Sequence, residues 1–310
     1  MGEDQWGVTH VGPRAPGDVA DILNVLGLPG MTNAERITTG WGGTAIWRME
    51  REGRTEALRI FPAGAHEARG REVAAMAAAL TGGVPAPEVV PAKSHPTHPA
   101  IVTTWCPGRT IAESLATAPW RARALGAAMG RTQARLHRVV APEIVRRRSP
   151  DWVAWAGSDE DALGDRVRAL PLRPDALLHL DFHPANVLVE DGRVTGVVDW
   201  ENTRAGDPRA DVARTASILW LARQSPELPR WSRPVLRLLE TGWRQGYRHE
   251  ARAGHETGRV TDMPLFDAWA CAAMISDLTP KVGMPGVWIR PEDLDDLRQR
   301  LARFKRRAGL

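Results

Sequence analysis

The chain has 310 residues, of which 43% are apolar and 25% are charged, the balance of an ordinary globular protein rather than a disordered one. Its length favours two joined lobes over a single core. The net charge of +4 arises mainly in residues 201–310, where 19 basic residues accompany 14 acidic ones, and so modest an excess does not indicate a nucleic-acid partner. No apolar run approaches the roughly 20 residues of a membrane span, and the first ten residues form no secretory signal. We therefore expect a cytoplasmic protein without membrane contact.

The first third of the chain predicts a small α+β lobe. Apolar residues recur at helical spacing in the predicted helices, whereas the predicted strands are short, rich in β-branched residues and separated by glycine-containing turns. The expected elements are a helix over 18–26, strands over 36–39, 44–49 and 56–61, a helix over 66–80 and a strand over 100–105. A turn at Pro107-Gly108 ends this part, so we expect an N-terminal lobe of residues 1–106 and a C-terminal lobe of residues 107–310.

Helices dominate the second part. They are expected over 118–139, 208–223, 231–247, 263–278 and 291–307, and a β-hairpin with strands over 185–189 and 194–199 interrupts them. The last helix has the clearest pattern, with Leu294, Leu297, Leu301 and Phe304 on one face. Cys106 and Cys271 form no metal-binding or disulfide pattern. The predicted fold class is α+β, with a small antiparallel sheet lobe followed by a larger, mainly helical lobe.

Three polar residues around the predicted hairpin suggest phosphoryl transfer. Asn186 follows Asp181 by five residues, and Asp199 ends an apolar strand thirteen residues later. Such a transfer needs one carboxylate to accept the proton of the attacking hydroxyl, and further oxygen ligands to hold a divalent metal against the phosphates. Asp181 fits the base, and Asn186 with Asp199 fits a Mg²⁺ site of hard oxygen ligands.

The segment around these residues resembles a known family. The pattern His-x-Asp-x-x-x-x-Asn over 179–186, followed by Asp199, is similar to the catalytic and metal-binding loops of the protein-kinase-like fold. The His-Pro pair at 183–184 and the continuation Gly-Asp-Pro-x-x-Asp over 206–211 resemble the aminoglycoside phosphotransferase family with its choline-kinase, homoserine-kinase and macrolide-kinase relatives. The resemblance implies a two-lobed kinase that transfers the γ-phosphate of ATP or GTP to a small-molecule hydroxyl, an activity found among antibiotic-modifying enzymes.

The resemblance also implies a nucleotide site in the N-terminal lobe. The glycine-rich turn between two strands would cover the phosphates with its backbone N–H groups, and the strand entering the interlobe hinge would hold the base. The residues assigned to these contacts are Thr39, Gly40, Gly42, Gly43, Thr103 and Trp105. The glycine spacing departs from the GxGxxG pattern of protein kinases.

A cation on the third strand should pair with a helix glutamate and contact the phosphates. None of the three lysines lies on that strand, and Arg59 occupies the matching place, with Glu72 as the matching acid. Arginine can bridge phosphate and carboxylate, although it is larger than lysine. The alternative is that Arg59 and Glu72 form an ordinary surface ion pair.

No motif in the sequence identifies the residues that contact the phosphate acceptor. Candidate substrate contacts are His183, Trp200, Glu201, Asp159 and Asp161. His183 could equally pack within the loop, and the acidic run over 159–165 could be a solvated helix face. His179 is expected to support the catalytic loop, whereas Asp207 and Asp211 are expected to cap and brace the helix that begins at Pro208.

Two other functions compete with the small-molecule kinase. A protein kinase is disfavoured because a helix is expected only eight residues after Asp199, which leaves no activation loop. A pseudokinase-like nucleotide-binding module is favoured by Arg59 in place of lysine, but the complete set of Asp181, Asn186 and Asp199 argues against it. Among small molecules, the basic C-terminal third favours an acceptor with few positive charges, such as an amino alcohol or a hydroxy amino acid. The oligomeric state has no signal in the sequence.

Overall fold

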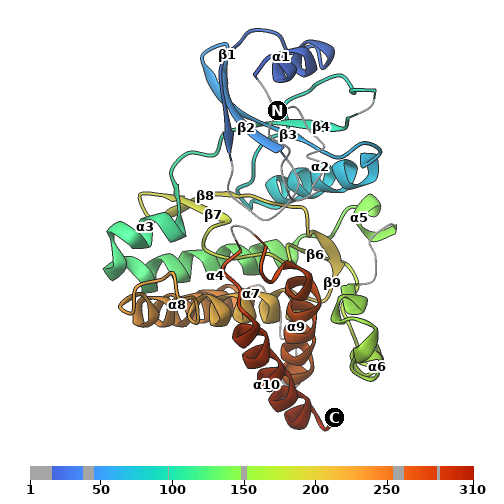
Figure 1. Cartoon of the computed structure of the whole chain (residues 1–310), viewed down its shortest axis with the longest axis vertical. Helices are drawn as coiled ribbons and strands as arrows, with labels where there is room; N and C mark the ends of the chain where they lie inside the picture. Colours follow the sequence, from blue (N-terminus) through green and yellow to red (C-terminus); the bar gives the residue numbers. More distant parts are fainter. Residues whose placement is uncertain (1–15, 38–44, 97, 148–151, 254–261, 285–286) are drawn as a thin grey trace. The chain divides into compact units, whose positions relative to one another are not determined.

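The computed structural model describes residues 16–37, 45–96, 98–147, 152–253, 262–284 and 287–310. Contacts divide the chain into two compact units, one of residues 1–73 and 87–105 and the other of residues 74–86 and 106–310 (Figure 1). No helix in the described ranges is both long and apolar enough to cross a membrane.

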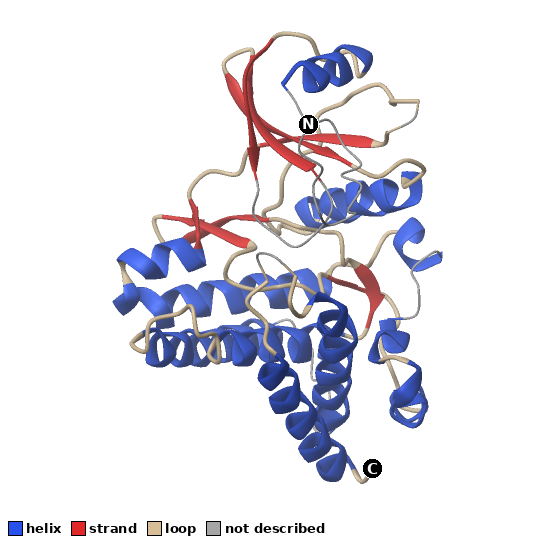
Figure 2. Cartoon of the chain, in the orientation of Figure 1, coloured by secondary structure: helices blue, strands red, loops and turns tan. Residues whose placement is uncertain are grey.

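The first unit contains a four-stranded antiparallel sheet in the order β1-β2-β3-β4 (Figure 2). Its elements are helix α1 (Pro16–Val25), strands β1 (Met31–Ile37), β2 (Ala45–Arg51), β3 (Arg54–Ile60) and β4 (Ala100–Thr104), and the first part of helix α2 (His66–Thr81). Val19 and Leu23 of α1 share a core with Leu58 of β3. The β2–β3 turn has positive φ at both Glu52 and Gly53, the geometry that a two-residue hairpin of right-handed twist requires.

The second unit is mainly helical and carries two small sheets. Its helices are α3 (Ile111–Thr117), α4 (Ala122–Arg138), α5 (Glu143–Arg147), α6 (Asp161–Arg168), α7 (Pro208–Ala222), α8 (Ser232–Ala253), α9 (Met263–Leu278) and α10 (Pro291–Ala308). One sheet joins β5 (Arg109–Thr110), β7 (Val187–Glu190) and β8 (Arg193–Val197), and the other pairs β6 (Ala176–Leu178) with β9 (Arg204–Gly206). The turn between β7 and β8 again has two residues of positive φ, Asp191 and Gly192.

Helices α4 and α8 approach each other closely enough to require glycine on both. A Cβ atom added at Gly126 or Gly130 of α4 would collide with backbone atoms of α8, and one added at Gly242 or Gly246 would collide with backbone atoms of α4. Gly126 faces Leu239, and Gly130, one turn later in α4, faces Trp243, one turn later in α8. The two helices therefore run in the same direction. This contact sets a short distance between α4 and α8, which the side chains that bond across the two helices must span.

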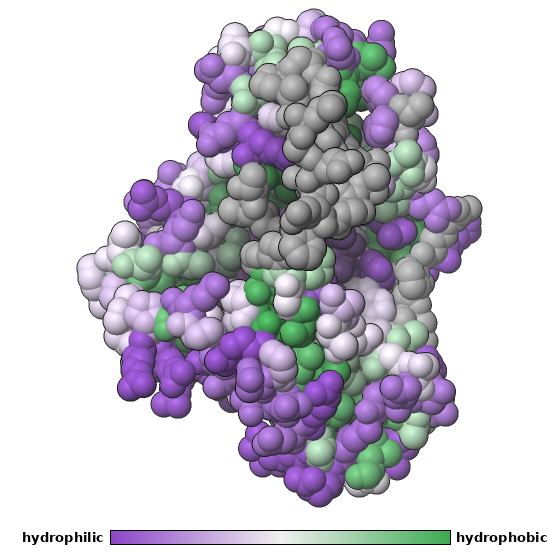
Figure 3. Space-filling model, viewed as in Figure 1, coloured by the Kyte–Doolittle hydropathy of each residue, from purple (hydrophilic) through white to green (hydrophobic). Residues whose placement is uncertain are grey.

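Helix α10 confirms the amphipathic pattern in the sequence. Leu294, Leu297, Leu301 and Phe304 are all buried, where they join cores that include residues of α9. Hydrophilic side chains dominate its outward-facing side in the space-filling view (Figure 3). The α+β class, with a small antiparallel sheet region and a larger helical part, is confirmed.

Candidate active site

The loop between β6 and β7 carries the predicted base. Asp181 follows Leu180, which is fully buried and has a φ of 60°, a left-handed conformation that is unusual for a branched residue. Such backbone strain persists only where surrounding contacts hold it, and it concentrates at functional sites. The loop is therefore constrained immediately before Asp181.

Asn186 holds the Asp181 side chain from the far end of the loop. The Asn186 Nδ2 donates to the Asp181 carboxylate at 3.1 Å and to its backbone carbonyl at 3.0 Å. Because Nδ2 faces Asp181, the amide oxygen of Asn186 points away from that carboxylate. Nε2 of His183 lies 3.5 Å from Asp181 Oδ2, and its Nδ1 accepts the Ala185 N–H at 3.3 Å. Within the loop, therefore, the base is oriented by an amide and an imidazole.

Asp199 is brought beside this loop by the β7–β8 hairpin. The ladder pairs Val187 with Val197, and beyond it the Val198 N–H donates to the Asn186 carbonyl oxygen at 3.0 Å. Asp199 follows with an exposed side chain and a φ of 63°. Backbone and side-chain hydrogen bonds thus join the segments that carry Asp181, Asn186 and Asp199.

His179 fastens these two segments together from beneath. Its Nε2 lies 3.0 Å from the Val198 carbonyl, to which it donates, and its Nδ1 accepts the Asp181 N–H at 3.3 Å. The ring is fully buried, and burial lowers the pKa of His179 and keeps it neutral, as these two bonds require. This arrangement agrees with a supporting role for His179 rather than one in acid–base chemistry.

The surroundings keep Asp181 ionised. Burial by itself would raise the pKa of Asp181, but the contact with His183 and the charge of Arg214 outweigh burial and hold the pKa below its usual value. Arg214 is 6% exposed, and its Nε donates to the Leu180 carbonyl at 3.3 Å. An ionised carboxylate that is 24% exposed can accept a proton from a hydroxyl group.

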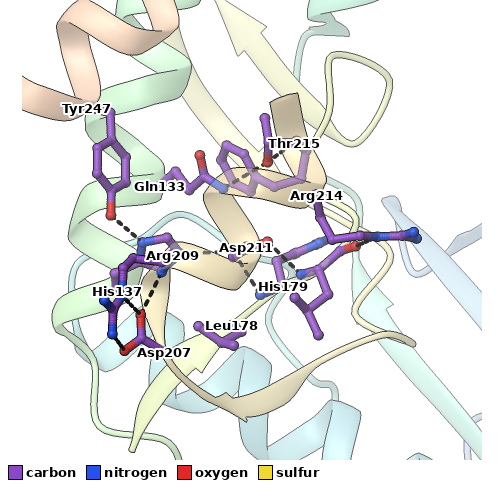
Figure 4. A network of polar contacts seen from close by, with 12 residues as sticks. Gln133, His137, Leu178, His179, Asp207, Arg209, Asp211, Arg214, Thr215 and Tyr247 are labelled. Carbon is purple, nitrogen blue, oxygen red and sulfur yellow. Dashed lines mark hydrogen bonds and ion pairs between the residues drawn. The ribbon is translucent and has the colours of Figure 1, made fainter. Parts of the chain in front are cut away.

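Asp211 has a different role from the one expected. Asp207 does cap α7, since its side chain accepts the Arg209 N–H at 2.9 Å. Asp211 instead accepts the backbone N–H of Leu180 at 2.8 Å and that of His179 at 3.1 Å (Figure 4). It also accepts from Nε2 of His137 at 2.9 Å. Asp211 therefore anchors the loop that carries Asp181 and is not simply a brace for its own helix.

Arg59 and Glu72 form a buried ion pair in the first unit. Arg59 NH1 lies 3.0 Å from Glu72 Oε2, with side-chain exposures of only 14% and 5%, so the pair is not the surface ion pair of the alternative interpretation. It connects β3 to α2, and the guanidinium also lies over the Phe61 ring. A second buried pair, Arg51 with Glu56, was not expected from the sequence; its two bonds are 2.7 and 2.8 Å long.

The other residues predicted on the nucleotide side differ in their surroundings. Thr39, Gly40, Gly42 and Gly43 lie outside the described residues. Thr103 pairs with Ala57 inside the sheet, and the Trp105 N–H donates to the Thr55 carbonyl at 3.2 Å. A nucleotide base could use that donor only by displacing Thr55.

The candidate substrate contacts range from enclosed to solvated. Trp200 is 1% exposed, with its Nε1 donating to the Val197 carbonyl and its ring beside His179. The expectation that it lines a substrate surface is corrected, because the ring is a core residue of the loop. Asp159, in the 3-10 turn before α6, and Asp161, the first residue of α6, are both exposed, which agrees with a solvated helix face. Glu201 is exposed in the turn after Trp200, and His183 remains part-exposed beside Asp181.

Residues outside the motif also support the loop, and the sequence did not point to them. Arg214 of α7 bonds the loop directly, His137 of α4 supports it through Asp211, and no local pattern marks either residue. The one signal in the sequence was the position of Asp211 within the Gly-Asp-Pro-x-x-Asp run.

Comparisons with known proteins bear on the family and the fold of the chain. A family model described as the phosphotransferase enzyme family matches residues 33–252, whereas no curated protein matches the chain. A candidate aminoglycoside phosphotransferase from Ralstonia eutropha JMP134 is 16% identical, with a TM-score of 0.65 over 94% of this chain and 97% of that one. A thermostable mutant of aminoglycoside phosphotransferase APH(4)-Ia, in ternary complex with AMP-PNP and hygromycin B, is 17% identical, with a TM-score of 0.59 over 94% and 99%.

A third similar structure is a microcompartment-associated aminopropanol kinase, 18% identical with a TM-score of 0.57 over 93% of this chain and 95% of that one. At such identities these likenesses show a shared fold, which is the kinase-like fold predicted from the motif.

Proposed function

Since this chain belongs to the phosphotransferase enzyme family, we propose that it is a small-molecule kinase that transfers the γ-phosphate of a nucleoside triphosphate to an alcohol group, with Asp181 as general base. The observation that carries this proposal is the grouping of Asp181, Asn186 and Asp199 through the Asn186 side-chain bonds and the Val198–Asn186 backbone bond. Within this function, residues 1–106 would bind the nucleotide, and residues 107–310 would supply catalysis and the acceptor site. The intracellular nucleotide supply fits the expected cytoplasmic location.

The residues present fit a magnesium ion. The amide oxygen of Asn186 is turned away from Asp181, and the Asp199 carboxylate is exposed on the adjacent segment. One carboxylate and one amide oxygen form a hard donor set of the kind that Mg²⁺ completes with water and phosphate oxygens. When bound, Mg²⁺ would neutralise charge on the phosphates. Asn186 would then have two tasks, holding a ligand through its oxygen and orienting Asp181 through its nitrogen.

Asp181 would act by accepting the proton of the attacking hydroxyl. Its ionised state, maintained by His183 and Arg214, supplies the lone pair, and the bond from Asn186 restricts where that lone pair points. His183 is a part-exposed side chain in contact with the base, so it would meet either the acceptor or the transferred phosphate. Arg59, positioned by Glu72, would contact the nucleotide phosphates.

The donor and acceptor are proposed at the level of class. Fold neighbours solved with AMP-PNP and with ADP support an adenine nucleotide. Their acceptors differ, since one was solved with hygromycin B and another is named an aminopropanol kinase. Among the acids over 159–165, Asp159, Asp161 and Asp165 are exposed and Glu160 is paired with Lys305, so we favour an amino alcohol or hydroxylated metabolite with few positive charges over a multi-amine aminoglycoside.

The test is a product-detected screen with ATP and with GTP. The panel contains amino alcohols, hydroxy amino acids, macrolides and aminoglycosides, and the readout is a mass gain of one phosphate. A phosphorylated small molecule whose formation requires Asp181 supports the proposal. Efficient turnover of only the polycationic members would overturn the charge argument, and phosphorylated protein without any small-molecule product would overturn the class.

A nucleotide-binding module without turnover is the second candidate. It is favoured by the presence of Arg59 where the family's lysine is expected, and the burial of the Arg59–Glu72 pair would suit tight binding. Nucleotide binding without hydrolysis or transfer, in wild-type protein and in the Asp181→Asn variant alike, would favour this second candidate.

A further inference from the structure

A pocket of about 730 Å³ lies in the second unit between the start of α7 and the C-terminal half of α8. Val212 contributes to its wall from α7, and Trp243, Tyr247 and Ala251 contribute from successive turns of α8. None of the predicted catalytic or metal-binding residues is among its described lining residues. A cavity of this size accommodates a metabolite-sized ligand.

The pocket combines an apolar wall with arginines, of which Arg173 and Arg244 are balanced by Asp175 and Glu240 outside the lining. Four arginines and two aspartates line it together with proline, valine, methionine and aromatic side chains. Arg209 engages both aspartates, Asp207 at 2.8 Å and Asp262 at 3.1 Å. Arg248 donates its Nε to a backbone carbonyl and, among the residues that the structure describes, pairs with no carboxylate. The chemistry of the lining therefore suits a ligand with an apolar body and a single anionic group.

One wall residue begins a chain of hydrogen bonds to the catalytic loop. The hydroxyl of Tyr247 lies 2.8 Å from Nδ1 of His137, and Nε2 of His137 lies 2.9 Å from Asp211 (Figure 4). Asp211 in turn accepts the N–H groups of His179 and Leu180, immediately before Asp181. Three links thus connect the pocket to the strained residue that precedes the base.

A second wall residue begins a parallel chain. Nε1 of Trp243 donates to Oε1 of Gln133 at 2.7 Å, and Nε2 of Gln133 donates to the Thr215 hydroxyl at 2.9 Å. The Thr215 hydroxyl donates to the carbonyl oxygen of Phe182 at 3.0 Å, immediately after Asp181. The second chain therefore ends on the opposite side of the base from the first.

The two chains form a ladder across three helices. Each of α8, α4 and α7 contributes two residues four positions apart, which lie on one helical face. The close glycine contact between α4 and α8 keeps the first links short. His137, Asp211, Gln133 and Thr215 are all fully buried, so solvent does not compete for the interior bonds of either chain. Contiguous buried networks of this kind can carry a coupling free energy between two sites.

We propose that the α7–α8 pocket binds an amphipathic anion, with an apolar ring or chain and one carboxylate, sulfonate or phosphate, and that this binding changes the ordering of the loop that carries Asp181. The ligand would contact Tyr247 directly and Arg248 through its charge, and it would reach the fully buried Trp243 only through the movement of neighbouring wall residues. Movement of either aromatic residue would alter the first hydrogen bond of its chain. The last bonds of the two chains, to the backbone on both sides of Asp181, would change as a result. Ligand binding in the pocket and its effect on the loop do not depend on the kinase reaction. Only the consequence for catalysis rests on the proposed kinase function.

Binding is tested with 8-anilinonaphthalene-1-sulfonate, an apolar ring system with one sulfonate, by fluorescence titration of the full chain. Arg248→Glu should weaken the probe's Kd at least tenfold, and Ala251→Trp should do the same by filling the pocket. The matched control is Arg237→Glu, an equal charge change at an exposed position of the same helix outside the pocket. The proposal is overturned if the Kd is the same in wild type, Arg248→Glu and Ala251→Trp.

Coupling is tested by amide hydrogen exchange of the segment 179–182, which needs no substrate and so separates this proposal from the kinase function. Saturating probe should change exchange at the His179 and Leu180 amides in wild type and in Arg237→Glu. The double variant Tyr247→Phe with Thr215→Val removes one hydroxyl from each chain. It should bind the probe with a Kd within about threefold of wild type, since both aromatic rings of the pocket remain, yet lose the exchange response. Unchanged exchange in probe-saturated wild type, or a full response in the double variant, would refute the coupling.

Discussion

Asn186 Nδ2 bridges two oxygens of Asp181, the carboxylate Oδ2 at 3.1 Å and the backbone carbonyl at 3.0 Å. The two residues lie at the two ends of one loop, so this bridge closes the loop and sets the direction of the carboxylate. A carboxylate held in this way can act as a base only along the direction that the bridge leaves open, which makes its loss measurable in catalysis.

Asp181→Asn should lower kcat by ~10²–10⁴, the usual contribution of a general base, with nucleotide affinity retained because the side chain keeps its shape. Single-turnover rates and nucleotide titrations measure the two effects separately. Asp191→Asn is the matched control, since Asp191 is an exposed residue of the β7–β8 turn and asparagine tolerates its positive φ. Wild-type turnover in Asp181→Asn would remove Asp181 from the mechanism.

Asp199→Asn should weaken Mg²⁺ binding while leaving the fold intact. Asparagine tolerates the φ of 63° at this position but replaces a charged ligand by a neutral one. The initial rate is measured against Mg²⁺ concentration, and half-saturation should move to a higher concentration. An unchanged Mg²⁺ curve would show that the metal ligand lies elsewhere.

Arg59→Ala and Glu72→Ala should each raise the KM for the nucleotide, and the double variant should cost less than the sum of the singles because the residues act as a pair. Their coupling energy should be about 0.5–3 kcal/mol. The Arg51–Glu56 pair, buried in the same sheet, provides the control. Its double-mutant cycle should show coupling in unfolding free energy without a change in KM. Strictly additive effects of the two substitutions on KM would show that Arg59 and Glu72 act independently.

Gly242→Ala should destabilise the protein by about 1–3 kcal/mol, because the added methyl group meets the backbone of α4 and forces the two helices apart. Gly164→Ala in α6 is the matched control. Its nearest neighbour is the flexible end of Arg168, so the change should be neutral or stabilising by up to about 1 kcal/mol through helix propensity. Urea unfolding measures both variants, and equal effects would show that the α4–α8 contact is looser than described.

Stability should fall as the pH rises from about 9 towards 11. Burial raises the pKa of the Cys106 and Cys271 thiols to about 11, from 9.0 in the unfolded chain. The thiols are therefore protonated in both states below pH 9.0, and above it the unfolded chain ionises first and is favoured. Cys271→Ala should flatten this decline in unfolding free energies measured between pH 8 and 11.

At pH 8 neither native thiol should react with a disulfide reagent, whereas both should react in denaturant. Rapid native-state labelling would contradict the burial.

The sequence by itself determined the features that obey local rules. Leu294, Leu297, Leu301 and Phe304 repeat at helical spacing because one face of a helix must be buried, and all four are buried. An Asp-Gly pair between two strands favours a two-residue hairpin turn with positive φ, and Asp191 and Gly192 adopt that conformation. The spacing of Asp181, Asn186 and Asp199 likewise points to the family, because all three residues belong to one short stretch of chain. By contrast, β5, β6 and β9 have only two or three residues each, too few to carry a periodic pattern.

Only the tertiary structure decided which residues support the site. Asp211 was expected to brace its own helix, but it binds the loop 31 and 32 residues before it. His137 meets Tyr247 across 110 residues, and Arg59 with Glu72 is buried rather than exposed. Trp200 lies in the core although it was a candidate substrate contact. The physical reason is that these partners are selected by how helices and strands pack, above all by the glycine contact between α4 and α8, and packing brings together residues whose separation along the chain carries no local signal.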